Sequence, residues 1–386
     1  MKNSSNNYNI YRSSRRRNAA KRRNFVIGCL ALCMCCVIAD IVFISMLLSK
    51  KDKEPAKATQ ATTETSALET DESGNVITVD PSQSGSDIAP ESTPASSETT
   101  AAQRTQTVSA ETRAANLSTL QTKVGDYLSK QSGRYSMCYI NMANGEMIAV
   151  NERTPFVAAS SIKLAYNTFL YEKAVAGELN LDEKMAYKAQ KYPDGDFEGG
   201  TGTIQNSADG TEFTLKEVSH LSITVSDNCG TNMILRRLGG IDEINNSFMK
   251  PISAAVDYRT QVSYTNYRGD TSQGKNRTSS LDLAKYAEHL YNDWKGSPDS
   301  YQPLIDDLCS TEYNWGVPGG VPGSYKVAHK VGFNDPYGAY NDLAIVFGTE
   351  DYVLAVMTES GDANAAKNII GEVSKMVYEY IESNYA

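Results

Sequence analysis

The chain has 386 residues, a net charge of −9, three histidines and seven cysteines. Positive charge is concentrated in the first 23 residues and the remainder is acidic, which favours a membrane surface on one side and argues against nucleic-acid binding. Four cysteines fall inside the apolar run 25–48, so little material remains for a zinc site, and we expect neither a metal nor a cofactor. The other three, Cys138, Cys229 and Cys309, could form one disulfide at most, and we interpret them as small buried apolar residues.

The N-terminal part predicts a membrane anchor. Residues 1–24 are basic, and the apolar run Phe25–Leu48 is about long enough to cross a bilayer as a helix. Eight Lys and Arg precede the run, whereas the lysines that follow it are interleaved with Asp52 and Glu54. This bias predicts a single-pass cell-membrane protein with a cytoplasmic N-terminus and an extracellular domain.

Other interpretations of this segment fit less well. A cleaved signal peptide has a shorter apolar core and a small-residue cleavage site, which the run 25–48 lacks. The sequence before Cys29 suggests a lipid-anchored cysteine, but that motif lies at the start of the run and not at its end. Asp40, inside the span, either faces a partner helix or is a lone carboxyl that is protonated or reaches the outer interface.

Residues 49–115 predict a disordered linker. They are rich in Ser, Thr, Ala, Glu and Gln, and they cannot bury enough apolar surface to offset the entropy of ordering the chain. A flexible linker of about 65 residues reaches roughly 45 Å, which would hold a domain away from the membrane within a cell-wall layer. The globular domain is expected at 116–386.

Strand and helix patterns alternate along this domain. The predicted elements are a helix at Leu117–Ser129, hairpin strands at 135–141 and 146–150, helices at Leu215–Val225, Asn228–Leu238 and Ser280–Tyr291, strands at Tyr325–Val331, Asp342–Gly348 and Tyr352–Glu359, and a closing helix at Ala363–Tyr385. Glycine-rich loops interrupt the middle at Asp194–Gly202 and Tyr264–Asn276. Strands at both ends predict an α/β (α+β) fold, with one antiparallel sheet built from both termini, flanking helices and an inserted all-helical subdomain.

The segment 156–166 carries the most informative motif. An apolar approach ends on a small-residue turn and enters a helical pattern that stops near Gly177, so Ser160 lies at or near a helix N-terminus. Free backbone N–H groups there favour developing negative charge. Lys163 lies one turn on, on the same face, and its amine could take the serine proton if burial favours its neutral form.

Ser-x-x-Lys alone is weak evidence, because a helix start followed by a solvated lysine has the same pattern. The chain repeats it at Ser247–Lys250 and Ser272–Lys275. Two downstream motifs distinguish Ser160. Ser226-Asp-Asn228 begins 66 residues after this serine, and Lys330-Val-Gly332 begins 102 residues after Asn228.

In this order and spacing, the three motifs resemble the superfamily of class A β-lactamases and penicillin-binding, DD-peptidase-like serine hydrolases. The resemblance covers about residues 116–386 and includes the strand Tyr340–Val346 after the lysine motif. It implies a β-lactamase/transpeptidase-like fold. It also implies that Ser160 is the acylated nucleophile, Lys163 its proton acceptor and Ser226 the relay of a proton to the leaving nitrogen.

The resemblance also implies the substrate-binding residues. Asn228 would hold the lysine and the substrate side chain, and Lys330 would add positive potential where a substrate carboxylate binds. The backbone N–H groups of Ser160 and of Phe333, which follows Gly332, would form the oxyanion hole. Asp227 is expected to fix the loop, and the whole Ser-Asp-Asn motif could also be a helix N-cap.

The chain departs from the superfamily pattern at two places. Val331 replaces the usual threonine and loses a hydroxyl toward the substrate carboxylate, a contact worth about 1.5–3 kcal/mol. The same tripeptide occurs at Lys123–Gly125, so strand context alone identifies Lys330. Between Asn228 and Ser280 the only glutamate is Glu243, so the loop from Tyr264 lacks the water-activating base of class A hydrolases.

These observations predict a membrane-anchored extracytoplasmic serine hydrolase that forms an acyl-enzyme at Ser160. Its expected substrates are β-lactams or cell-wall peptides, with weak deacylation. The alternative is a DD-peptidase-like protein or a non-turnover protein that binds peptidoglycan peptides. The intact set of motif residues favours the enzyme, whereas Val331 and the missing glutamate favour the binder.

Overall fold

The computed structural model describes residues 106–191, 195–260, 262–269 and 271–385. The predicted basic segment, apolar span and most of the predicted linker lie outside these residues. Within them, no helix combines the length and the apolar character needed to cross a membrane.

A five-stranded antiparallel sheet joins the two ends of the described chain. Its strand order is β2-β1-β11-β10-β9. The strands are β1 (Arg134–Asn141), β2 (Met147–Val150), β9 (Lys326–Asn334), β10 (Ala339–Phe347) and β11 (Tyr352–Glu359). The first hairpin pairs directly with the last strand, with Tyr139 opposite Leu354. The prediction of one antiparallel sheet from both termini is therefore confirmed.

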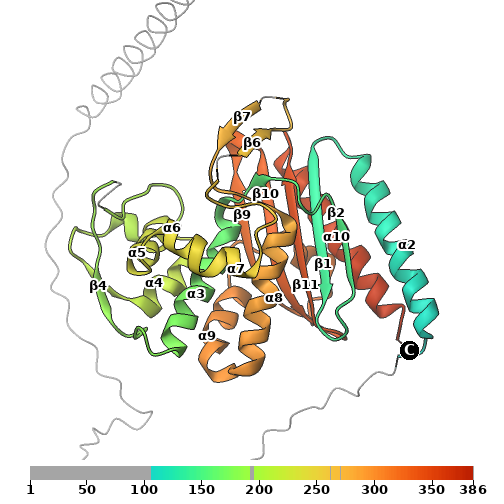
Figure 1. The fold of residues 1–386 in the computed structure, drawn as a ribbon, viewed down its shortest axis with the longest axis horizontal. Coiled ribbons are helices and arrows are strands. Elements are labelled where there is room, and N and C mark those ends of the chain that lie inside the picture. Colours follow the sequence, from blue (N-terminus) through green and yellow to red (C-terminus); the bar gives the residue numbers. More distant parts are fainter. Residues whose placement is uncertain (1–105, 192–194, 261, 270, 386) are drawn as a thin grey trace, which may run out of the picture. The chain divides into compact units, whose positions relative to one another are not determined.

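Both faces of this sheet are covered by helices (Figure 1). Alternate residues of β1 point to opposite faces, so Met137 and Tyr139 pack with α2 (Ala110–Ser129) and α10 (Ala363–Glu382). Cys138 and Ile140 pack on the other side with a larger helical core. Because both faces are buried, β11 is apolar on both sides, and the polar residues of the neighbouring strands, such as Asn341 and Asp342 of β10, are buried as well.

The helical subdomain lies between β3 (Phe156–Val157) and β9 in the sequence. Its longer helices are α3 (Lys163–Val175), α4 (Leu215–Thr224), α5 (Asn228–Arg237), α8 (Ser280–Gly296) and α9 (Pro298–Cys309). The short helices around residue 245 are α6 (Ile241–Ile244), a π-helical turn (Asn245–Met249) and α7 (Lys250–Ile252). The predicted α4 and α5 agree with the structure within one residue at their C-terminal ends. The helix α9 was not predicted, because its Pro298 and Pro303 are typical of loops; Pro298 is tolerated in the first turn, where its missing N–H needs no partner.

Further elements differ from the sequence expectation. The helical subdomain also contains a short antiparallel pair, β4 (Lys184–Ala186) with β5 (Glu212–Thr214). The predicted loop Tyr264–Asn276 contains a small hairpin, β6 (Val262–Thr265) paired with β7 (Thr271–Gly274). The helix α2 begins seven residues before the predicted Leu117, inside the segment whose composition predicted a linker. Ser109 caps it by accepting a hydrogen bond of 3.2 Å from the Thr112 backbone N–H.

The early turn of α2 is held to the sheet by a buried ion cluster. The Arg113 guanidinium, only 4% exposed, donates to Glu146 at 2.6 Å and to Glu350 at 2.7 Å. These carboxylates come from the β1–β2 turn and the β10–β11 turn. Composition did not reveal this contact, because a single arginine in a polar stretch has no periodic pattern.

The three cysteines of the described chain are free. Cys138 and Cys229 are buried and Cys309 is half-buried. The prediction that these residues are small buried side chains is confirmed for Cys138 and Cys229, whereas Cys309 is only half-buried.

Candidate active site

Ser160 lies in a tight turn where the chain leaves β3 and enters the helical subdomain. The turn η1 (Ala159–Ile162) is a 3₁₀ helix that leads directly into α3. Ala159 adopts the left-handed region with φ 48°, which is uncommon for a residue with a side chain and marks a sharp change of direction. The half-buried Ser160 is therefore presented at a helix start, as the sequence predicted.

Gly332 allows β9 to approach this turn. A Cβ atom at residue 332 would lie 2.5 Å from the Ser161 nitrogen and 2.9 Å from the Ser160 nitrogen. Only a residue without a side chain fits at these distances. The glycine thus brings the strand that carries Lys330 directly against the backbone of Ser160.

Lys163 is buried beside the Ser-Asp-Asn motif. Its Nζ donates to the Ser226 carbonyl at 2.6 Å and to the Asn228 Oδ1 at 2.9 Å, and it lies 3.3 Å from the Ser226 Oγ. Burial lowers the pKa of Lys163 to about 7, although the nearby Asp227 and Glu198 oppose the shift. A substantial fraction of this amine is therefore neutral at physiological pH.

Lys330, on strand β9 of the sheet, approaches Ser226. Its Nζ lies 3.1 Å from the Ser226 Oγ and 3.1 Å from the Val331 carbonyl oxygen. The side chain is fully buried, and this burial, together with the charge of Lys163, lowers the pKa of Lys330 well below its usual value. Ser226 consequently bridges two lysines, which is the arrangement needed to pass a proton across the site.

The Ser-Asp-Asn motif is fixed by its aspartate. The Asp227 carboxylate accepts bonds of 2.8 Å from the Gly230 N–H at the start of α5, and of 2.5 and 2.8 Å from the N–H groups of Thr203 and Ile204. Ser226 itself has φ 54°. The loop before the motif and the helix after it are thus joined through one carboxylate.

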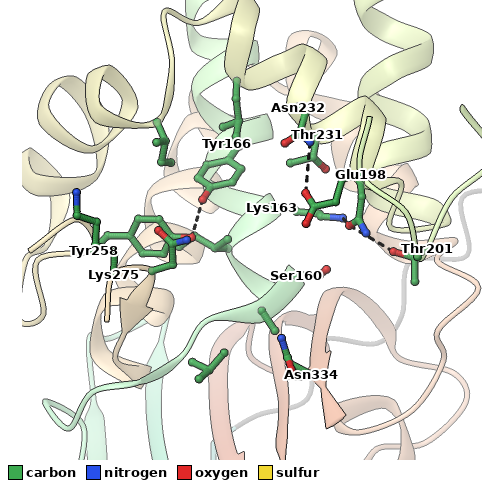
Figure 2. Close-up of a pocket in the computed structure, with 18 of the residues that line it drawn as sticks. Ser160, Lys163, Tyr166, Glu198, Thr201, Thr231, Asn232, Tyr258, Lys275 and Asn334 are labelled. Carbon is green, nitrogen blue, oxygen red and sulfur yellow. Dashed lines mark hydrogen bonds between the residues drawn. The ribbon is translucent and has the colours of Figure 1, made fainter. Parts of the chain in front are cut away.

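A cavity of about 760 Å³ opens over Ser160 (Figure 2). Of the predicted site residues, Ser160, Lys163, Asn228 and Phe333 line it. Ser226 and Lys330 are buried and do not line it: Ser226 contacts the lining residue Lys163, and Lys330 contacts Ser226. Val331 is fully buried and does not belong to the lining, so its side chain is not exposed to a ligand in this structure.

The cavity also contains residues that the sequence did not single out. These are mainly Tyr166, Glu198, Tyr258, Arg259, Lys275 and Arg277. Figure 2 shows Lys275 and Tyr258 on the opposite side of the cavity from Thr201. The one sequence signal for Glu198 was its position in the glycine-rich loop before the Ser-Asp-Asn motif. No local pattern indicates how such a loop folds, so the sequence could not place this side chain in the cavity.

One group of side chains in the described chain has ligand atoms close enough for a metal ion. It consists of Glu172, His289 and Asp293, between α3 and α8. The His289 Nε2 is 2.5 Å from a Glu172 carboxylate oxygen, so the two already satisfy one another. None of the three lines the cavity over Ser160.

Comparison with known proteins identifies the family. A family model described as the beta-lactamase enzyme family matches residues 119–381, more than half of the chain. The chain belongs to the beta-lactamase enzyme family.

Individual relatives of this family are distant in sequence. The β-lactamase of Bacillus licheniformis is 24% identical over 257 residues, which are 64% of this chain and 78% of the relative. A β-lactamase of Citrobacter koseri is 25% identical over 261 residues, which are 65% of this chain and 85% of the relative.

Solved structures confirm the predicted fold. The structure of PBP-A is 27% identical with a TM-score of 0.59 and covers 69% of this chain and 97% of its own. An ancestral class A β-lactamase, 22% identical with a TM-score of 0.57 over 67% of this chain and 99% of its own, shares the fold. The chain is thus a serine hydrolase of the superfamily of class A β-lactamases and penicillin-binding proteins.

Proposed function

We propose that this member of the beta-lactamase family forms an acyl-enzyme at Ser160 with β-lactams or related amides and esters. The Ser160 oxygen attacks the carbonyl carbon while Lys163 accepts its proton. Ser226 then delivers a proton to the leaving nitrogen as the carbon–nitrogen bond breaks. The product is an ester of Ser160, which water hydrolyses in a second step.

The observation that carries this proposal is the state of Lys163. An exposed lysine is protonated at neutral pH and cannot take a proton from serine. Lys163 is 4% exposed, its pKa is lowered to about 7 by burial, and it lies one turn from Ser160. A solved structure of a PBP-A mutant is an acyl-enzyme complex with penicillin G, which supports β-lactams as acylating agents for this chain.

The test is the intact-protein mass after mixing with a slight excess of penicillin. Acylation opens the ring and adds the whole mass of the antibiotic, so one adduct per chain is expected, and it should persist for many minutes because deacylation is slow. Ser160→Ala should abolish the adduct, whereas Ser247→Ala, which alters a second Ser-x-x-Lys motif on the surface, should leave it intact. If the protein forms no adduct and the antibiotic is not consumed, the proposal is contradicted.

A cell-wall peptide is the second candidate substrate. The cavity extends from Ser160 to a cationic side that carries Arg259, Lys275 and Arg277. This length and charge suit an acidic peptide larger than penicillin. A DD-peptidase would release the terminal residue of such a peptide, whereas a non-turnover binder would protect Ser160 from penicillin without releasing anything.

The proposed location is the outer face of the cell membrane. The eight basic residues before the apolar run 25–48 support a cytoplasmic N-terminus and a single-pass anchor. The polar segment that follows would then act as a tether for the hydrolase domain.

A further inference from the structure

Glu198 extends into the cavity over Ser160 from a loop that precedes the Ser-Asp-Asn motif in the sequence. Figure 2 shows its side chain beside those of Asn232 and Lys163, above the Ser160 hydroxyl in this view. The Asn232 side chain donates a hydrogen bond of 3.3 Å to the Glu198 Oε2. The glutamate is exposed, so water in the cavity can reach its carboxylate.

Glu198 is the one carboxylate among the described residues that line this cavity. Asp227 is nearby but is 1% exposed and accepts three backbone hydrogen bonds, so its oxygens are already occupied. Glu243, the one glutamate between the Ser-Asp-Asn motif and α8, accepts a hydrogen bond from Ser247 on the surface and does not belong to the lining.

The loop that carries Glu198 is held firmly against α5. The Cys229 Sγ contacts the backbone of Glu198 on both sides, 3.4 Å from its nitrogen and 3.4 Å from its oxygen. Two residues before, Asp196 is fully buried and pairs with Arg236 at 2.9 Å. On the other side of Glu198, the Thr201 carbonyl accepts a bond of 3.2 Å from the Asn228 N–H. The backbone of Glu198 is therefore positioned by the same helix that begins with the catalytic motif.

We propose that Glu198 is the general base that activates water to hydrolyse the Ser160 ester, an inference that rests on the proposed acyl-enzyme. Its carboxylate takes a proton from a water molecule while the water oxygen adds to the ester carbonyl. The tetrahedral intermediate then collapses, the bond from carbon to the Ser160 oxygen breaks, and that oxygen takes up the proton held by Glu198, which is passed on through Lys163. The free acid and the original enzyme are the products.

This assignment places the base on a different loop from the one where the sequence analysis looked for it. The proposed base approaches the water from the side of Asn232 and α5, and not from the loop that contains β6 and β7. Among the described residues, Asn232 is the one hydrogen-bond donor to this carboxylate, so we expect it to be weakly constrained and deacylation to be slower than acylation.

The experiment separates the two steps in the whole chain. Penicillin G is mixed with wild type, Glu198→Gln and, as a matched control, Glu212→Gln, which alters an exposed glutamate of β5 outside the cavity. Adduct formation and adduct decay are followed by intact mass. We expect Glu198→Gln to acylate within about threefold of wild type and to lose its adduct about 10²- to 10⁴-fold more slowly. Glu212→Gln should match wild type in both steps.

Other results would overturn the inference. Equal decay rates in wild type and Glu198→Gln would exclude Glu198 as the base, and so would a wild-type adduct that never decays. If the rates of adduct formation and adduct decay both fall to the same extent in Glu198→Gln and in Glu198→Asp, the role of Glu198 is structural instead. Failure of wild type to form any adduct would refute the proposed function itself, and this result is distinct from the others because it appears before Glu198 is altered.

Discussion

The Lys163 Nζ donates a hydrogen bond of 2.9 Å to the Asn228 side-chain oxygen, although the two residues are 65 positions apart. Asn228 in turn donates to the Gly199 carbonyl at 3.2 Å, one residue from Glu198. Because the Asn228 amide contacts both the lysine and the neighbouring loop, the proposed proton acceptor for acylation and the proposed base for deacylation are positioned by the same side chain.

The pH dependence of acylation should report the pKa of Lys163. Burial lowers this pKa to about 7, so the amine is mainly protonated below that pH and cannot take the Ser160 proton. The acylation rate constant should therefore fall about tenfold per pH unit below the pKa and level off above it. The measurement is the rate of penicilloyl adduct formation between about pH 5 and about pH 9. A flat profile over this range would contradict the role of Lys163.

Two identical tripeptides provide a matched pair of glycine variants. A Cβ at residue 332 would lie 2.5 Å from the Ser161 nitrogen, whereas a Cβ at residue 125 in α2 has no neighbour within 4 Å. Gly332→Ala should displace the Ser160 turn and lower the acylation rate by about 10²-fold. Gly125→Ala should leave acylation unchanged and raise the free energy of unfolding by about 1 kcal/mol. Penicillin labelling and chemical denaturation test both; similar labelling of the two variants would argue against a close β9 approach.

The buried cluster at the start of α2 should matter for stability. Arg113→Ala would leave Glu350, whose side chain is 6% exposed, without its cation, and should lower the free energy of unfolding by about 3–5 kcal/mol. Lys123→Ala, on the same helix as Arg113, removes an exposed ion pair with Glu379 of α10 and should change the free energy of unfolding by less than about 1 kcal/mol. Urea unfolding of both variants compares them. Equal effects of the two substitutions on the free energy of unfolding would mean that the residues before Leu117 contribute little to the stability of the domain.

The proposed membrane orientation predicts the outcome of proteolysis on intact cells. Protease added outside should release the hydrolase domain by cleavage before α2 and leave the N-terminus protected. A tag at residue 1 and an antibody to the domain distinguish the two ends. Protection of the domain with cleavage of the tag would reverse the orientation.

Much of the fold followed from short-range pattern. The first hairpin was predicted because a turn at Asn144-Gly145 separates two apolar runs, and β1 and β2 pair there. The helices α4 and α5 were predicted because their hydrophobic spacing repeats over a few residues, and in the structure the side chains of Thr214 and Asp227 cap them. Among the elements that were missed, α9 and the β6–β7 hairpin contain proline or glycine signals that are typical of loops.

The sequence by itself determined the order and spacing of the three motifs, and through them the family and the candidate nucleophile. The Ser-x-x-Lys pattern alone did not distinguish Ser160 from Ser247 and Ser272, because a buried lysine and a solvated one have the same local sequence. Only the tertiary structure decided that Lys163 is surrounded by Ser226 and Asn228, that Arg113 is buried and that Glu198 enters the cavity. Local pattern reflects hydrogen bonds and side-chain spacing within a few residues, whereas these contacts join segments 30 to 240 positions apart, as in the approach of Arg113 to Glu350, 237 positions away. Such contacts form only when the whole sheet and helical subdomain close around them.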